Sequence, residues 1–420
     1  MRKRWLSLGA LVSVIAALVA SCGKGSGELD PEDLGIGGPD SNFSGGAAGS
    51  EKNFAALINN FAQAKPAHQP WAGFWWPYTS NGIARSTHEG ASPAGRYDAA
   101  RGRTTNAQNW EVHKHGSAVP KVQGWWGHCN GWCVAAALFP EPRAAIKVNG
   151  IRFGIGDIKA LLTEAGMEAS ADFFGERVDP WDRNYQRKFE DTIPNQFMLV
   201  LTNYMGIHRK TVLIDRFTGG EVWNQPLAGY RFEYPKPSDY LGVDPQAPNV
   251  HRLNVTATIW WMEDNVPPEI QTPPFDFKES RTVTARTLKM EVWLDGPVVF
   301  GADGKITQSG NLIVARRGDY LVGGAWKNGH INHGHPDYMW VPYSILKVDP
   351  VAEVQYANAH IDIDWIKKHV LSGGVDDPSV TPAPIEPAPA PSPRPSPGQP
   401  PATPAHPPGP PVPGNGGVGG

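Results

Sequence analysis

The sequence predicts an α+β fold, with helices around a mostly antiparallel sheet. Apolar residues recur at helical spacing early in the chain, as in Phe54, Leu57, Ile58 and Phe61. Between residues 197 and 318 the chain has runs rich in β-branched and aromatic residues, bounded by turn residues. Helical segments followed by strand-like segments are typical of α+β domains rather than of alternating α/β domains.

Further elements follow from the same patterns. Helices are expected at "GDIKALLTEAG" (156–166), which ends on a glycine cap signal, and at "HIDIDWIKKHV" (360–370). "ADGK" (302–305) predicts a tight turn. Strands are expected at "FMLVLTNYMG" (197–206), "KTVLIDRF" (210–217), "NVTATIWWME" (254–263), "LKMEVWLDG" (288–296) and "NLIVARRG" (311–318).

Residues 1–22 predict a lipoprotein signal peptide. A basic start precedes an apolar stretch that is short for a membrane span, and Val19-Ala20-Ser21-Cys22 resembles a bacterial lipobox. Cys22 would then carry the lipid, and Gly23 after it resembles outer-membrane sorting. We expect an exported bacterial lipoprotein at the outer membrane or cell surface, with the periplasmic side left open. The alternative is an ordinary cleaved signal with an incidental cysteine.

The rest of the chain divides by composition into a tether, a folded domain and a tail. Residues 23–50 are rich in Gly, Ser and Asp and predict a flexible tether. Residues 376–420 hold 17 of the 41 prolines and no aromatic residue, which predicts a disordered, solvated tail. Residues 51–375 are left as the folded domain, which is long enough for a large core.

Charge and hydropathy exclude two classes of partner. The formal net charge is −3 and the pI is about 6.5, so there is no basic field for nucleic acid. After the signal, no apolar run is long enough for a transmembrane helix. We therefore expect contact with a membrane only through the lipid anchor.

A cysteine pair in "GWWGHCNGWCVAAAL" (124–138) is the main chemical signal. Glycines followed by an alanine run place Cys129 in the first turn of a helix, where unpaired N–H groups favour a thiolate. Cys133 would lie one turn further on the same face. The pair could also form a disulfide, for which the side-chain directions are poor, or be two inert buried thiols.

A series of motifs resembles the oomycete transglutaminase-elicitor family. "VWNQPLAGYRFEY" (222–234) is similar to its elicitor-peptide segment. "WAGFWWPY", "SPAGRYDAA", "NWEVHKHG", "GWWGHCNGW", "FPEP" and "VNGIRFGIGDIKALL" precede it in the family's order, and "GHPDYMW" follows. The likeness runs from about Trp71 to Trp340.

This resemblance implies a papain/transglutaminase-like core and cysteine-dependent acyl transfer from a glutamine carboxamide to a primary amine. It places the nucleophile at Cys129, within Cys-x-Gly-Trp, and leaves Cys133 to packing. The expected substrates are protein or peptide glutamines and primary amines. No cofactor and no bound metal are predicted, and dependence on a divalent cation is left open.

The general base is harder to assign. The family pattern has a histidine after the phenylalanine of "QFMLVLTN", and this chain has Met198 there. His335 and Asp337 in "GHINHGHPDYMW" are the expected base and orienting residue, and Asp215 is the alternative carboxylate. His128, next to the nucleophile, is expected to point elsewhere. His330, His333 and His335 also have a spacing that could bind a metal or anchor a loop.

Aromatic and amide residues are expected to border the thiol. Trp126, Trp132, Trp223 and Asn224 form the predicted substrate cleft, with Asn224 or Gln225 near the oxyanion. A tryptophan-rich core is the structural alternative. Two other functions stay open, a papain-like peptidase or amidase acting on peptides or cell-wall stem peptides, and a non-catalytic surface binding protein.

Overall fold

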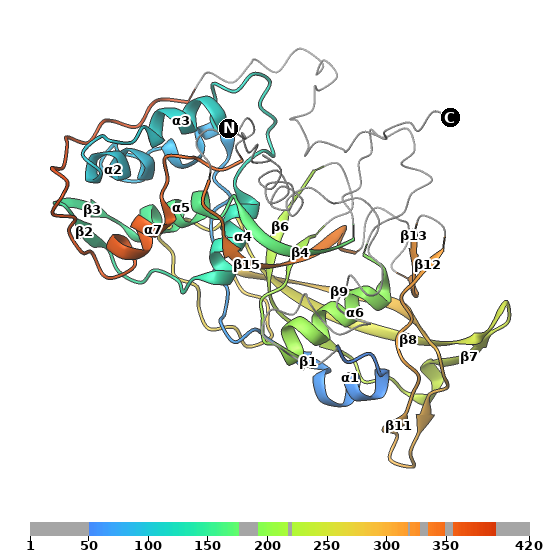
Figure 1. The fold of residues 1–420 in the computed structure, drawn as a ribbon. Coiled ribbons are helices and arrows are strands. Elements are labelled where there is room, and N and C mark those ends of the chain that lie inside the picture. The colour runs from blue at the N-terminus through green and yellow to red at the C-terminus, as the bar shows by residue number, and fades with distance from the viewer. Residues whose placement is uncertain are drawn as a thin grey trace, which may run out of the picture.

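The computed structural model describes residues 50–175, 192–216, 221–317, 320–327, 335–348 and 356–391. Helices α2, α3, α4, α5 and α7 gather at one end of the molecule, and a large antiparallel sheet extends from them with α1 and α6 beside it, which confirms the α+β class (Figure 1). The helices are α1 (Phe54–Phe61), α2 (Pro93–Ala100), α3 (Ala107–Lys114), α4 (Cys129–Leu138), α5 (Ile155–Ala165), α6 (Pro194–Val200) and α7 (Ile363–Trp365). None of the helices in these ranges combines the length and apolarity needed to cross a bilayer.

The main sheet is antiparallel throughout and has strand β6 near its centre. Its order is β14-β9-β8-β6-β5-β15-β4, and β1 and β7 pair with β6 and β8. These strands are β1 (Gln63–Ala64), β4 (Ala169–Gly175), β5 (Leu213–Asp215), β6 (Asn224–Phe232), β7 (Tyr240–Asp244), β8 (Ala247–Met262), β9 (Val283–Leu294), β14 (Ala325–Trp326) and β15 (Tyr338–Ile345).

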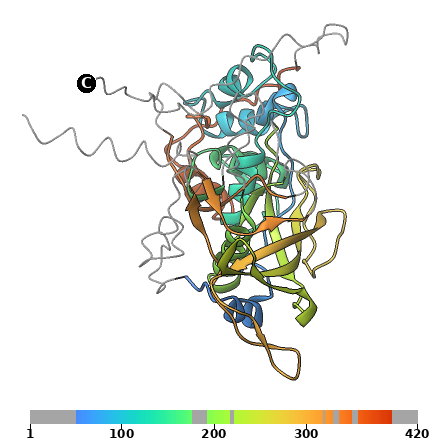
Figure 2. The same cartoon turned by 90° about the vertical axis from the view of Figure 1, so that its right-hand side faces the viewer.

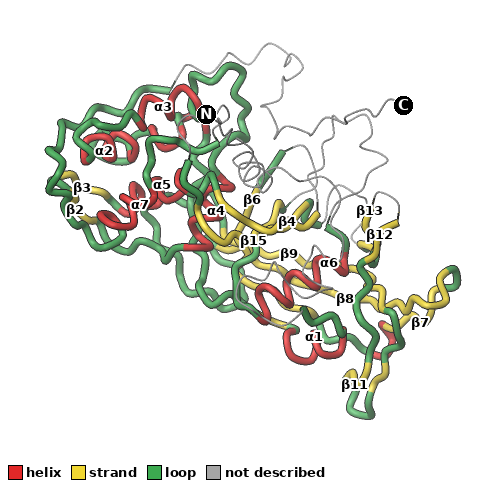
Figure 3. Tube along the Cα trace, viewed as in Figure 1, coloured by secondary structure: helices red, strands yellow, loops and turns green. Residues whose placement is uncertain are grey.

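Three short hairpins complete the described strands (Figure 3). They are β2 (Ile146–Val148) with β3 (Ile151–Phe153), β10 (Val299–Phe300) with β11 (Ile306–Gln308), and β12 (Ala315–Arg317) with β13 (Tyr320–Val322). The predicted "ADGK" turn joins β10 to β11, and Gly304 in it has a φ of 78°. Glycine adopts this left-handed conformation at little cost, and the predicted turn is confirmed.

Alternating side chains divide the sheet between two hydrophobic cores. Along β8, Leu253, Val255 and Ala257 face one core, and in β15 Met339 and Val341 do the same. Trp260 and Trp340 face the other core with the helices α2, α4 and α5. Side chains of a strand alternate in direction, so one sheet serves both cores. Figure 2 shows the result, with α1 at the end opposite to α2 and α3.

Most predicted elements are confirmed, but "FMLVLTNYMG" is not a strand. Residues Pro194–Val200 form helix α6, which continues as π-helical turns over Leu201–Ile207. Pro194 occupies the first turn of the helix, where its missing N–H is harmless and its fixed φ favours a helix start. Thr202 donates its hydroxyl to the Met198 carbonyl at 2.7 Å, a bond that a helix provides. The run is buried on all sides, so its periodicity could not separate helix from strand.

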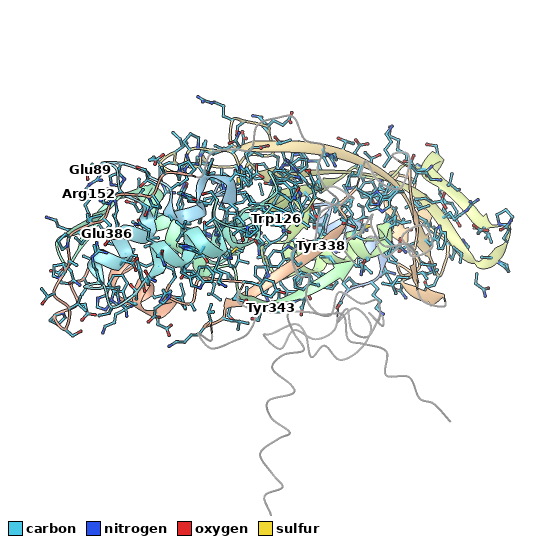
Figure 4. The ribbon with its side chains drawn as sticks, turned by 90° about the horizontal axis from the view of Figure 1, so that it is seen from above. Glu89, Trp126, Arg152, Tyr338, Tyr343 and Glu386 are labelled. Carbon is cyan, nitrogen blue, oxygen red and sulfur yellow. The ribbon has the colours of Figure 1, made fainter. Side chains whose placement is uncertain are left out.

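Part of the proline-rich segment lies against the helical end. Residues 376–391, called the strap here, run past α2 and α3, and Figure 4 shows Glu386 at the same end as Glu89 and Arg152. The Ala383 N–H donates to the Ala99 carbonyl at 3.0 Å, and Arg103 pairs with Glu386 at 2.7 Å. Extended proline-rich chains leave their carbonyls free to accept hydrogen bonds. The structure therefore differs here from the solvated tail expected from residue 376.

Candidate active site

Helix α4 begins at Cys129, as the sequence predicts, and packs against helix α5 and strand β6. Gly131 lets α4 approach α5, because a Cβ there would collide with the Thr163 carbonyl. Trp132 packs against Gly73, whose own Cβ would collide with the indole ring. The Gly and Trp of the Cys-x-Gly-Trp motif thus hold the start of α4 in place, through the close contacts of Gly131 with Thr163 and of Trp132 with Gly73.

The thiol of Cys129 is almost covered. Its exposed fraction is 7 %, and its hydrogen bond goes to the Val222 carbonyl at 3.8 Å. The half-buried rings of Trp75 and Trp223 lie beside this stretch, with centroids 5.6 Å apart. Gly127 has no side chain, which leaves room for Trp75 directly before the cysteine. A substrate would therefore approach the sulfur beside aromatic rings.

Asn224, the first residue of β6, directs two donors at the thiol. Its side-chain oxygen accepts from Trp340 Nε1 at 3.0 Å and from the Tyr338 hydroxyl at 3.3 Å. An indole nitrogen can only donate, so this assignment of the amide oxygen is fixed. The amide nitrogen and the backbone N–H of Asn224 then face Cys129, and both lower its pKa. Two such donors suit a thiolate or an oxyanion.

Taken together, however, the surroundings of Cys129 raise its pKa. Burial raises the pKa to about 12, and the charges of Asp264 and Asp215 act in the same direction, against the Asn224 hydrogen bonds. The sequence predicts a lowered pKa from the helix start, and this prediction is wrong because the thiol is cut off from water. Burial also raises the pKa of Cys133 well above its usual value. Both thiols are unpaired, so no disulfide joins them.

Strands β5, β6 and β15 bring the predicted carboxylates together. Asp215 accepts the Trp223 N–H at 2.9 Å, and its own carbonyl accepts the Asp337 N–H at 3.1 Å. Both aspartates have no exposed surface. Figure 4 labels Tyr338, which follows Asp337, and Trp126 near the middle of the molecule. Asp215 acts on the Cys129 pKa, so this carboxylate is part of the thiol's surroundings.

The ring of His335 lies against a tryptophan. It stacks on Trp326 of β14, with centroids 4.8 Å apart, and is 3 % exposed. In the described part of the chain, no hydrogen bond links a histidine ring to the Cys129 sulfur. His330 and His333 lie outside the described residues, as does Cys22. The pairing of His335 with Asp337 as base and orienting residue stays a prediction.

The ring of His128 turns into a group of buried charges. Its Nε2 lies 2.9 Å from Glu111 Oε1, 2.7 Å from Glu164 Oε2 and 3.2 Å from His115 Nδ1. We call these four residues the Glu–His cluster. Burial lowers the pKa of His128, but the two carboxylates outweigh it and raise the pKa to about 10. As expected, the ring nitrogens of His128 are directed to other partners, Glu111, Glu164, His115 and the Trp76 carbonyl.

Comparison with known proteins bears on this arrangement. Residues 108–239 match the family described as transglutaminase elicitor. This part of the chain is therefore similar to the transglutaminase elicitor family. The match includes the Glu–His cluster, Cys129, Asp215 and Asn224, and the sequence resemblance is thereby confirmed. A search of curated proteins finds no match.

The fold agrees with a solved transglutaminase. The chain is similar to the crystal structure of the GP42 transglutaminase from Phytophthora sojae, with a TM-score of 0.53 and 19% sequence identity. The similarity covers 76% of this chain and 94% of that chain. At this identity the likeness concerns the fold, and it shows that the chain has the fold of that transglutaminase.

The four residues of the predicted aromatic cleft differ in exposure. Trp132 has no exposed surface and lies in the core, whereas the prediction put it at the border of a cleft. Trp223 and Trp126 are half-buried, and Asn224 is 2 % exposed. Trp126 Nε1 has no hydrogen-bond partner among the described residues. The small residues around Trp132 allow full burial, which composition alone does not reveal.

Sequence reasoning missed two neighbours of the thiol. Asp264, two residues after the end of β8, accepts from Gln225 Nε2 at 2.8 Å and is 5 % exposed. Burial raises the pKa of its carboxyl. Trp75 precedes the domain match and covers the chain at Gly127. "WAGFWWPY" contributed to the family resemblance, but the sequence does not single out Trp75 within it, and no pattern in the sequence places Asp264 near Cys129.

Proposed function

We propose that this protein is a cysteine-dependent acyltransferase, with Cys129 attacking the carboxamide of a protein or peptide glutamine. The observation that carries the proposal is the pair of Asn224 donors directed at a thiol on the first residue of a helix. The family match over this region and the transglutaminase fold support it. Fold alone would not, because function depends on the site.

The reaction needs the sulfur, two donors and a proton acceptor. The sulfur attacks the carboxamide carbon, the C–N bond breaks, and nitrogen leaves as ammonia with the thiol proton. Asn224 stabilises the negative charge that develops on the carboxamide oxygen. A primary amine then attacks the thioester, the C–S bond breaks, and an amine proton returns to sulfur.

The proton acceptor is a carboxylate close to the thiol or the predicted His335–Asp337 pair. Asp264 is the stronger carboxylate candidate, since burial raises its pKa and a more basic carboxylate accepts a proton more readily. Asp215 also acts on the thiol, but its side chain already accepts the Trp223 N–H. We therefore place Asp264 first and keep Asp215 as the alternative.

The aromatic surroundings favour an amine over water as acyl acceptor. Trp75, Trp126 and Trp223 are half-buried and can cover the carbon chain of a lysine while its amine reaches the thioester. Burial of four methylenes contributes about 3 kcal/mol, or roughly a hundredfold bias toward the amine.

The test is incorporation of a labelled primary amine into a glutamine-containing protein, with ammonia release measured in parallel. We expect both in the native protein, loss of both in Cys129→Ala, and retention in the matched control Cys133→Ala, one turn along the same helix. Loss of both in Cys133→Ala alone would contradict the proposal.

A non-catalytic binding protein is the second candidate, favoured by the 7 % exposure of the thiol and its pKa of about 12. No incorporation and no ammonia release from a folded, reduced protein would support it. Ammonia release at the same rate with and without amine would indicate the peptidase or amidase alternative.

The proposal also includes export of the protein and lipidation at Cys22.

A further inference from the structure

The Glu–His cluster includes His128, the residue directly before the proposed nucleophile Cys129. The proposed reaction does not use this cluster. Glu111 and His115 come from α3 and its C-terminal end, His128 caps α4, and Glu164 lies on α5. All four are buried, with exposed fractions of 0, 5, 0 and 0 %. Each directs one nitrogen or oxygen inward, and these atoms all lie within 4.8 Å of one another.

The cluster places two carboxylates and two imidazole rings in one buried space. His128 Nδ1 lies 2.9 Å from the Trp76 carbonyl, which can only accept, so Nδ1 carries a hydrogen and Nε2 faces the cluster. His128 Nε2 and His115 Nδ1 face each other at 3.2 Å. Two carboxylates buried this close together are costly unless positive charge neutralises them, and a bound cation would supply that charge.

A second observation points to a ligand. The Oε2 atom of Glu164 has no hydrogen-bond partner among the described residues, although it lies 2.7 Å from His128 Nε2. The other carboxylate atoms are held from outside the cluster. The Asn358 N–H donates to Glu164 Oε1 at 2.6 Å, and the Ile83 N–H donates to Glu111 Oε1 at 3.1 Å. The backbone thus orients the carboxylates and leaves one oxygen aimed inward.

We propose that Glu111, His115, His128 and Glu164 bind one divalent transition-metal cation of the zinc class. Four ligands at about 2.1 Å from a tetrahedral ion are about 3.4 Å apart. His128 Nε2 lies 2.7 to 3.2 Å from an atom of each of the other three residues, and the four ligand atoms all lie within 4.8 Å of one another, so a small inward shift of the side chains would complete the tetrahedron. The cation would neutralise both carboxylates while both rings stay neutral.

Ligand chemistry narrows the choice of ion. Two imidazoles and two carboxylates suit zinc and similar ions, whereas Ca²⁺ takes six to eight oxygens and Mg²⁺ demands an octahedral oxygen shell. The His128 Nδ1–H bond to Trp76 fixes the tautomer with Nε2 free to ligate, as is usual for metal-bound histidines. The site is closed, so its role is to hold α3, α4 and α5 together beside Cys129.

The test uses the full chain without a histidine tag, purified in metal-free buffer. We expect about one zinc-class ion per chain by elemental mass spectrometry after dialysis. Cobalt exchanged into the site should give the visible absorption of four-coordinate N/O ligation. Chelation should lower the unfolding temperature, and added Zn²⁺ should restore it.

Variants locate the ion. His115→Gln and Glu164→Gln should lower metal affinity by at least tenfold, while His113→Gln, an exposed histidine on the same helix, should retain the ion. The proposal is overturned if the native chain holds no metal and neither Zn²⁺ nor Co²⁺ shifts its unfolding temperature.

It is also overturned if the folded variants His115→Gln and Glu164→Gln keep the metal, or if the bound cobalt shows the absorption of a thiolate ligand.

If those variants do not fold, the cobalt spectrum and the chelation shift of the native chain decide between the outcomes. These readouts do not involve acyl transfer, so failure of the metal site and failure of the proposed reaction are distinguishable.

Discussion

Two carboxylates, Asp215 and Asp264, act on the Cys129 thiol and oppose the Asn224 donors. At the resting state the thiol therefore keeps its proton, and the nucleophile must be activated when substrate binds. Exclusion of water by a bound glutamine strengthens the Asn224 hydrogen bonds, because charge interactions grow in a medium of lower polarity. Activation by substrate rather than by a permanent thiolate is consistent with this residue set.

Replacing Asp264 separates its charge from its role in proton transfer. Asp264→Asn removes a negative charge, so the Cys129 pKa should fall and iodoacetamide alkylation at fixed pH should become faster, by about threefold to tenfold. The same variant should slow amine incorporation if Asp264 accepts the thiol proton. Asp276→Asn, an exposed aspartate, is the control with no expected effect. Slower alkylation in Asp264→Asn would contradict this account.

The position of Cys129 could be predicted from sequence, but its environment could not. Glycines followed by alanines are a local signal for a helix start, and the structure begins α4 at that residue. The pKa depends on burial and on Asn224, Asp264 and Asp215, which are distant in the chain. No local pattern reports that packing.

At the scale of elements, the contact of α4 with α5 positions the thiol. Gly131→Ala places a methyl group against the Thr163 carbonyl and the Met167 side chain. A backbone carbonyl cannot move aside, so we expect a loss of about 1 to 3 kcal/mol in the free energy of unfolding, despite alanine's better helix propensity. Denaturant titration measures this.

Gly124→Ala is the matched control, because a Cβ at this position meets nothing within 4 Å. It should leave stability within about 0.5 kcal/mol. Equal stability of Gly131→Ala and Gly124→Ala would show that the close approach of α4 to α5 does not constrain the site.

The strap is a second element whose removal has a defined consequence. Truncation after Val375 removes the Ala383 and Arg103 bonds and the hydrogen bond from the Asp377 N–H to the Asn149 side chain at 2.8 Å. At about 1 kcal/mol for each net hydrogen bond, the unfolding temperature should fall by about 5 °C. Truncation after Pro391 should change it little. Identical unfolding temperatures for the two truncations would mean that the strap adds no stability.

Element prediction succeeded where one face of a segment was exposed or where a turn bounded it. β8 and β9 alternate between the two sides of the sheet, and the sequence showed that period. Helix α6 was wrongly predicted as a strand because every residue from Pro194 to Val200 is buried, so no polar face revealed the helical period. The packing of the strap was not predicted, because composition does not reveal which backbone groups form hydrogen bonds with a neighbouring surface.

For the whole molecule, the Glu–His cluster shows what a single sequence conceals. Its members lie on three helical segments between residues 111 and 164, and the local hint is the four-residue spacing of Glu111 and His115. The sequence directed attention instead to His330, His333 and His335. The α+β class and the family were predictable because they rest on many ordered segments rather than on one meeting point.

Membrane attachment is the prediction that concerns the whole chain. If Cys22 is lipidated, Cys22→Ala should move the protein from the membrane fraction to the soluble fraction on cell fractionation, because one residue carries the acyl chains. Cys133→Ala, made in parallel, should stay with the membrane. Retention of Cys22→Ala in the membrane fraction would show that the anchor lies elsewhere.

The central claim is that Cys129 forms a thioester with a glutamine substrate. Rapid acid quench of the native chain with a glutamine peptide, followed by intact mass spectrometry, measures this intermediate directly. We predict an adduct equal to the peptide less ammonia, located at Cys129 by digestion, removed by added primary amine, absent from Cys129→Ala and present in Cys133→Ala. An adduct at another residue, or amine incorporation that persists in Cys129→Ala, would contradict the account.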